Sequence, residues 1–228
     1  MPKLWLVASI CCSVAAQSPV FHLGPGIEPP FVVAKAKPEY SDEARLARLE
    51  GGVLLSLIVG SDGRPRDIQV ARPLGLGLDE QAVGNVRMWQ FKPGSKDGAP
   101  ADVLVQEEVF FRSQRSLWDW HLVRAIFQPA PQVKRPVLIA ARFPPTVDIE
   151  ENASVTVAFD VGPGGVPTRL RAVKSSSARW EDEVLKALHD GWRFRPGNLN
   201  DKPVAVPAWL EFVRGSHSPI PPAEIPSR

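Results

Sequence analysis

The side chains that could act as acids, bases, nucleophiles or metal ligands are scattered along this 228-residue chain. The histidines match no metal-ligand spacing; they are His22, His121, His189 and His217. The serines at 175–177 lack the Gly-x-Ser-x-Gly context of a nucleophilic serine. Acidic side chains gather where two helices are expected to begin, and there they complement the helix dipole; they are Asp79, Glu80, Glu181, Asp182 and Glu183. We therefore predict that the protein is not an enzyme and uses neither a cofactor nor a metal ion.

The N-terminal residues have the features of an export signal. Lys3 supplies a positive charge, residues 4–16 are mostly apolar, and small residues precede Gln17. The apolar run is too short to cross a bilayer, which takes about 20 residues. We predict that residues 1–16 are a cleaved signal peptide; the alternative is a retained membrane anchor at residues 4–16. Both cysteines, Cys11 and Cys12, lie in this segment, so the mature chain would have no thiol chemistry.

The composition is that of a globular protein, with 44% hydrophobic and 23% charged residues. The formal net charge is only +2, so no basic excess indicates a nucleic-acid partner. The 24 prolines concentrate in a few segments, which indicates extended connectors there. We expect an extended lead at residues 17–32 and a proline-rich tail at 215–228.

Two short phrases share a pattern of aromatic residues, proline and glycine: MWQFKPG at residues 88–94 and GWRFRPG at 191–197. Apolar residues at helical spacing precede each phrase, so we place each phrase at the end of a helix. Asp79 is expected to cap the first of these helices. The proline would stop the helix and the glycine would let the chain turn. We interpret the repeated side chains as structural; they are Trp89, Phe91, Pro93, Trp192, Phe194 and Pro196.

The flanks of the two phrases also correspond, which indicates a duplicated unit. Gly51–Pro73 aligns with Ala153–Ser175, and each stretch holds an apolar run, a glycine-containing turn and a second run typical of a β-hairpin. The second turn, GPGG, precedes a strand rather than a helix, so a hairpin is favoured over a phosphate-binding loop. We predict an α+β protein with two tandem small domains. Each would have a three-stranded antiparallel sheet, in the order strand-strand-helix-strand, and one or two helices on one face.

The expected boundaries follow from this repeat. The first domain is placed at residues 33–113 and the second at 136–214. A linker at 114–135 lies between them, and we expect that it could hold a short helix.

Residues 35–112 resemble the C-terminal domain of TonB-family energy transducers almost continuously. One part of the resemblance is KPEYSDEARLARLEGGVLLSLIVGSDGRPRDIQV, with a Pro-Glu-Tyr entry, a short helix, a Gly-Val strand and an Asp-Gly hairpin. The other is LGLGLDEQAVGNVRMWQFKPGSKDGAPADVLVQEEVFF, with a Leu-Asp helix, the Trp-x-Phe-x-Pro exit and a strand that ends on Phe. A second, diverged copy is expected at about 136–214, although residues 145–152 make a poor first helix.

The resemblance implies binding in the periplasm of Gram-negative bacteria and a link to transmembrane transport. The family's domain pairs the exposed edge of its last strand with a peptide segment of an outer-membrane transporter, and the unpaired backbone groups of an edge strand suit such pairing. Carried over, the peptide-binding edge consists of Val103, Leu104, Val105, Gln106, Glu107, Glu108, Val109, Phe110 and Phe111. A weaker second edge consists of Val204, Val206, Ala208, Leu210 and Phe212. The expected partner is an extended segment of an outer-membrane transporter or of another envelope protein.

One residue in each edge limits the pairing that the resemblance implies, and the proline in the second edge leads us to expect that the first edge dominates. Glu107 stands where the alternation calls for an apolar residue, and an inward charge guards an edge strand against unwanted pairing. Pro207 lies in the last strand of the second unit and lacks an N–H for a partner strand. The alternative to peptide binding is a structural envelope scaffold that self-associates through the same edges. An enzyme whose site escapes motif analysis is a third hypothesis.

Overall fold

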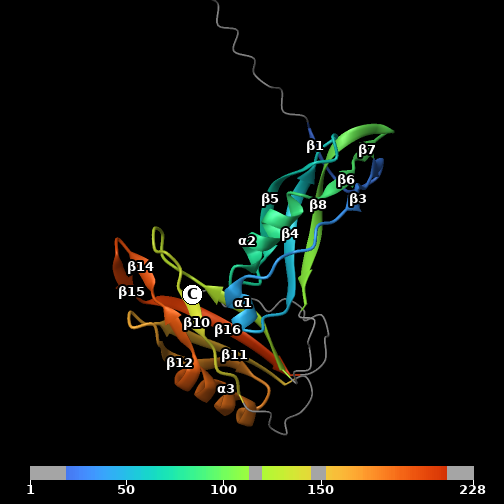
Figure 1. Cartoon of the computed structure of the whole chain (residues 1–228). Coiled ribbons are helices and arrows are strands. Elements are labelled where there is room, and N and C mark those ends of the chain that lie inside the picture. Colours follow the sequence, from blue (N-terminus) through green and yellow to red (C-terminus); the bar gives the residue numbers. More distant parts are fainter. Residues whose placement is uncertain (1–18, 113–119, 145–152, 215–228) are drawn as a thin grey trace, which may run out of the picture.

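The computed structural model describes residues 19–112, 120–144 and 153–214, and it is an α+β protein made of two similar units. The units lie end to end, and each has a mostly antiparallel sheet with a helix packed on one face (Figure 1). The predicted fold class is therefore confirmed. Glu43 and Arg135, one from each side of the junction, lie near the point where the units meet.

The first unit begins earlier in the chain than expected. Its strands are β1 (Val20–His22), β2 (Ile27–Glu28), β3 (Phe31–Ala34), β4 (Gly51–Val59), β5 (Pro65–Arg72), β6 (Gln90–Lys92), β7 (Gly94–Lys96) and β8 (Ala99–Phe111). Its helices are α1 (Asp42–Leu46) and α2 (Leu78–Val86). The main sheet has the order β2-β7-β8-β4-β5, and β1 adds to β8 in parallel. The lead at 17–32 thus contributes strands that pair with the domain.

The second unit repeats this plan. Its strands are β10 (Val137–Ala140), β11 (Ser154–Val161), β12 (Pro167–Ser175), β13 (Arg193–Arg195), β14 (Gly197–Leu199), β15 (Lys202–Val204) and β16 (Val206–Arg214). Its helix in the described residues is α3 (Ala178–Gly191), while residues 145–152, where a poor first helix was expected, lie outside the described residues. The sheet has the order β12-β11-β16-β9, where β9 (Trp120–Phe127) comes from the linker.

Buried and more exposed residues alternate along the central strands, and the buried ones form the two cores. On β4 the residues that face α2 are fully buried, and they are Val53, Leu55, Leu57 and Val59. Because successive side chains of a strand point to opposite faces, this pattern fixes which face of the sheet the helix covers. Val155, Val157 and Val161 do the same on β11.

The twin aromatic phrases lie at the helix exits, as predicted. Trp89 and Trp192 follow the ends of α2 and α3, and both are buried. The phenylalanines continue into short strands: the N–H of Phe91 donates to the carbonyl of Gly63 at 3.0 Å, and Phe194 does the same to Gly165 at 2.8 Å. A Cβ on either glycine would overlap the phenylalanine carbonyl. The phrase therefore ties the helix exit to the hairpin turn.

Two details of the helix ends differ from the prediction. The N-cap of α2 is Gly77 with φ 82°, and Asp79 instead accepts hydrogen bonds from the N–H groups of Leu74 and Gly75 at 2.7 and 3.1 Å. The glycines that close the phrases do not make a turn. Gly94 and Gly197 lie in strands, where a Cβ would overlap the side chains of Val103 on β8 and Val206 on β16, respectively. They allow close approach rather than a change of direction.

The linker contains a strand where a short helix was expected. Residues 120–127 form β9, and 113–119 lie outside the described residues. β9 pairs along β16 on one side, and on the other side it touches the first unit. The N–H of Glu50 donates to the carbonyl of Leu122 at 3.1 Å, and the N–H of Ala125 donates to that of Leu74 at 2.9 Å. The linker is thus a structural joint between the two units.

An ion pair reinforces this joint. The carboxylate of Glu43 on α1 accepts from both terminal nitrogens of Arg135, at 3.0 and 2.7 Å, and from the backbone N–H of Leu138 at 2.9 Å. Glu43 is 9% exposed and Leu138 is buried. Because the three bonds converge on one carboxylate, they fix the start of the second unit against the first.

Candidate peptide-binding edge

The long strand β8 has one side that is only partly paired. Its inner side pairs with β4 from Val103 to Phe111. Its outer side pairs with β7 over residues 99–101 and with β1 over 102–104. Over residues 105–111, no strand of the described ranges pairs with the outer side. The predicted edge of nine residues is therefore open for seven, because β1 already occupies the place beside Val103 and Leu104.

The open edge has an apolar face and a mixed face. Val105, Val109 and Phe111 point into the core and are at most 9% exposed. On the opposite face Gln106 is exposed and the ring of Phe110 is 50% exposed. A strand added here would gain backbone hydrogen bonds and would also bury part of Phe110.

Glu107 breaks the apolar face, as the sequence indicated. Its carboxylate lies 3.7 Å from Nζ of Lys35, and that ammonium also lies 4.4 Å from the ring centroid of Trp89. Lys35 comes from the segment between β3 and α1, which continues to Tyr40, whose ring meets that of Phe111 edge-on at 5.6 Å. This segment therefore lines the core face of β8 beside the open edge. Sequence analysis did not single out Lys35, and its only signal was an opposite charge far along the chain.

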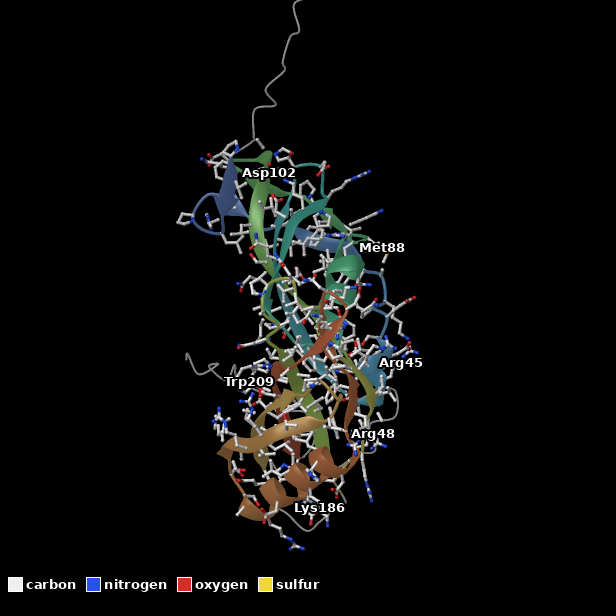
Figure 2. All side chains as sticks on the ribbon, turned by 90° about the vertical axis from the view of Figure 1, so that its left-hand side faces the viewer. Arg45, Arg48, Met88, Asp102, Lys186 and Trp209 are labelled. Carbon is white, nitrogen blue, oxygen red and sulfur yellow. The ribbon has the colours of Figure 1, made fainter. Side chains whose placement is uncertain are left out.

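Carboxylates on β8 also make ion pairs across the sheet. Glu108 pairs with Arg72 of β5, and the two side chains are each 30% exposed. Asp102 is buried, pairs with Arg66 and accepts from the N–H of Ser61 at 2.8 Å. Burial alone would raise the pKa of Asp102, but these hydrogen bonds and the Arg66 charge hold the pKa below its ordinary value. Figure 2 shows Asp102 at the end of the first unit that lies away from Lys186 and the second unit.

The second predicted edge is not open. β9 pairs in antiparallel with β16 from Ala208 to Arg214, so Ala208, Leu210 and Phe212 already have a strand beside them. Val204 belongs to the short strand β15, which pairs with β14. The expectation of a free second edge is therefore wrong along most of β16. The physical reason is that residues 120–127 combine β-branched, aromatic and leucine side chains that favour a strand.

Pro207 stands where the pairing with β9 ends. Its carbonyl accepts from the N–H of Gln128 at 2.9 Å, just beyond the pair formed by Phe127 and Ala208. The N and C=O of a strand residue point to the same side, so the missing N–H of Pro207 faces outward. The sequence-based concern about this proline is consistent with that geometry.

The described residues outside this edge bear on three other possibilities, namely metal sites, membrane spans and reactive histidines. Among the described residues no group of three or more His, Cys, Asp or Glu side chains is placed to hold a metal ion. None of the helices in the described ranges is long and apolar enough to cross a membrane. His189 lies on the surface beside Asp190, with 3.0 Å between Nδ1 and the carboxylate.

The two units share one small α+β fold with a long last strand, and comparison with known proteins identifies the family. The model of the family described as "Gram-negative bacterial TonB protein C-terminal" matches residues 36–112 and again residues 147–213, together more than half of the chain. The chain therefore belongs to the TonB C-terminal family and carries two copies of its domain. The family is a transport-related domain of the Gram-negative envelope and is not enzymatic.

A solved structure is also similar. The solution NMR structure of the Pseudomonas aeruginosa TonB C-terminal domain is 26% identical, and the match covers 42% of this chain and 95% of that chain with a TM-score of 0.32. A comparison with curated proteins gives no match.

Proposed function

We propose that this protein is a non-catalytic periplasmic binding protein whose β8 edge, Val105–Phe111, receives an extended peptide segment. The partner would be a segment of an outer-membrane transporter or of another envelope protein. The observation that carries the proposal is the seven-residue outer side of β8 that no described strand pairs, in a domain of the TonB family. Such an edge offers main-chain donors and acceptors in register for an added strand.

The proposal includes one active edge rather than two. The corresponding edge of the second unit is occupied by β9, so that unit would serve as a support that is joined to the first through β9 and Glu43. We propose domain boundaries that follow the strands: a first domain up to Arg112, the joint with β9, and a second domain from about Lys134 to Arg214. The protein would reach the periplasm through a cleaved signal peptide at residues 1–16, which lie outside the described residues.

Pairing of two β8 edges from two copies is the alternative, and the charges oppose it. An antiparallel pair centred on the open segment would place the two copies of Glu108 opposite each other, with Glu107 of each copy alongside. Like charges directly opposite on neighbouring strands are destabilising. A foreign segment is therefore a better match for this edge than a second copy.

N-methylated peptides test the proposed edge pairing without altering the protein. An added strand directs alternate N–H groups to its neighbour, so methylating one alternate set must abolish binding while methylating the other set must spare it. The probe is a neutral seven-residue peptide of alternating valine and threonine, added to residues 17–228 and followed by backbone amide NMR. We expect chemical-shift changes centred on 105–111 and their loss with only one methylated series. Equal effects of both series, or shifts located elsewhere, would refute the proposal.

A further inference from the structure

We propose that the β8 edge selects a basic and apolar segment that runs antiparallel to β8, with an arginine or lysine opposite Glu108. This inference rests on the proposed function, because it names the chemistry of the peptide that this edge would take. The molecule itself contains an example of such pairing, because β9 lies as an added strand on the corresponding edge of the second unit.

The two edges can be compared residue by residue. Val53 of β4 and Val155 of β11 correspond in the repeat, and their partners are Val109 and Phe212. Counting along both strands from this pair, Glu108 corresponds to Glu211, since their partners Leu54 and Thr156 also correspond. By the same register Val105 matches Ala208 and Glu107 matches Leu210.

β9 shows how a strand occupies such an edge. It lies antiparallel to β16, with Leu122 opposite Phe212 and Ala125 opposite Leu210; these two β9 side chains are at most 1% exposed. On the other face Arg124 lies opposite Glu211. The guanidinium and the carboxylate are 3.9 Å apart, and the side chains are only 16% and 12% exposed. The occupied edge thus combines alternate apolar contacts with one cross-strand ion pair.

The open edge keeps the same acidic position. Glu108 is 30% exposed and already pairs with Arg72 through one oxygen. A carboxylate accepts several hydrogen bonds, so its other oxygen is available to a cation on the incoming strand. That cation would lie on the mixed face beside the exposed ring of Phe110. An acidic residue at the same place would meet the carboxylate directly.

Glu107 adds to this preference on the core face. Its counterpart Leu210 is fully buried against Ala125, whereas Glu107 is 24% exposed and is held by Lys35, itself 53% exposed. An incoming segment with a bulky apolar residue opposite Glu107 would bury this ion pair, which costs desolvation. A small or polar residue there, as Ala125 is on β9, avoids that cost.

The remaining geometry sets direction and length. β1 runs parallel to β8 and stops at His22 beside Leu104. The added segment therefore covers 105–111, and in the orientation of β9 its N-terminus lies beside Phe111. The resulting pattern is an apolar residue opposite Val109, a cation opposite Glu108, a small residue opposite Glu107 and an apolar residue opposite Val105.

Peptides copied from β9 provide the test. The probe is WHLVRAIF, and the matched peptides carry glutamine or glutamate in place of the arginine. Each is titrated into residues 17–228, with backbone amides followed by NMR. We expect shifts at 105–111 and an affinity that falls about fivefold to tenfold from the arginine to the glutamate peptide, the range for reversing a cross-strand charge. E108Q should reduce that difference to less than about twofold. A nitroxide at the peptide N-terminus should broaden Phe110 and Phe111 more than Val105.

The outcomes separate this inference from the proposed function. Equal affinities for the three peptides at 105–111 would overturn the charge preference while leaving edge binding intact. Broadening strongest at Val105 would overturn the antiparallel direction in the same way. A charge preference that survives in E108Q would show that Glu108 is not its origin. If the neutral valine-threonine peptide binds at 105–111 and none of the β9 peptides does, the inference fails although the proposed function holds.

Discussion

Glu107 on β8 and Leu210 on β16 hold the same position in the two units, and among the described residues only the leucine also has a strand on its outer side. The charged residue has its cation, Lys35, at 3.7 Å. In the second unit the place of Lys35 is taken by Ala141, which follows β10 as Lys35 follows β3. The open edge thus carries an ion pair where the covered edge carries two apolar residues.

Replacing Glu107 by leucine should make the protein self-associate through the open edge. E107L removes the inward charge and completes an apolar face on β8, so copies of the protein should associate through this edge. Sedimentation velocity over a range of concentrations measures this. E107Q keeps the size and the polarity and should remain monomeric to higher concentration. If E107L and E107Q sediment alike, the apolar side chain at position 107 does not cause association, and the Glu107 carboxylate does not prevent edge-to-edge pairing.

Gly75 tests the contact between the first unit and β9. It has φ 97°, and a Cβ would overlap the carbonyl of Ala125. G75A should therefore lower the free energy of unfolding by about 2–4 kcal/mol and increase hydrogen exchange at Ala125, because both the strain and the lost contact act on the joint. Urea unfolding and exchange NMR measure the two effects.

The matched control is Gly84→Ala in α2. A Cβ at Gly84 meets nothing within 4 Å. Because alanine is the better helix former, G84A should raise the free energy of unfolding by up to about 1 kcal/mol. A loss of stability in G84A equal to that in G75A would contradict the explanation by contact with β9.

The ion pair between the units should be worth more than a surface pair. The side chains of Glu43 and Arg135 are 12% and 34% exposed, and the carboxylate also accepts from the N–H of Leu138. E43Q should lower the free energy of unfolding by about 2 kcal/mol, since it removes the carboxylate that Arg135 contacts directly and leaves only the more distant charges of Asp79 and Glu80. A double-mutant cycle with R135Q measures the coupling. A coupling energy near zero would mean that this ion pair does not help to hold the two units together.

The sequence predicted the parts of the fold that local patterns encode. Alternation along β4 and β11, the glycine turns and the paired aromatic phrases were sufficient for the two domains and their order. Asp79 was misassigned because a helix N-terminus can be formed by a glycine with positive φ, while the aspartate binds the preceding loop instead. Gly94 was misassigned because its role is close packing against Val103, which no local pattern reveals.

Long-range pairing explains what the sequence did not predict at the site. Which strand lies beside an edge depends on contacts between residues far apart, as for Phe21 beside Val103 and Ala125 beside Leu210. Residues 120–127 are compatible with either an amphipathic helix or a strand, and only docking on β16 decides between them. The open segment of β8 was therefore predictable as a last strand, but its limits at 105–111 were not.

Asp102 should make the stability of the first unit depend on pH in the acid range. The N–H of Ser61 and the charge of Arg66 outweigh its burial, so the folded pKa lies below the ordinary value of about 3.9. The stabilisation is therefore complete above about pH 5, declines as the pH approaches the unfolded value, and is lost as the pH falls through the folded pKa. D102N should lower the free energy of unfolding at pH 7 by about 1 kcal/mol, a modest value because Arg66 is 45% exposed. The difference between D102N and the unaltered protein should shrink as the pH falls below 4, which urea unfolding at a series of pH values measures.

Arg66→Gln should weaken the same pH dependence. A difference that stays constant from pH 7 to acid would show that the Asp102 carboxylate contributes through packing rather than through its charge.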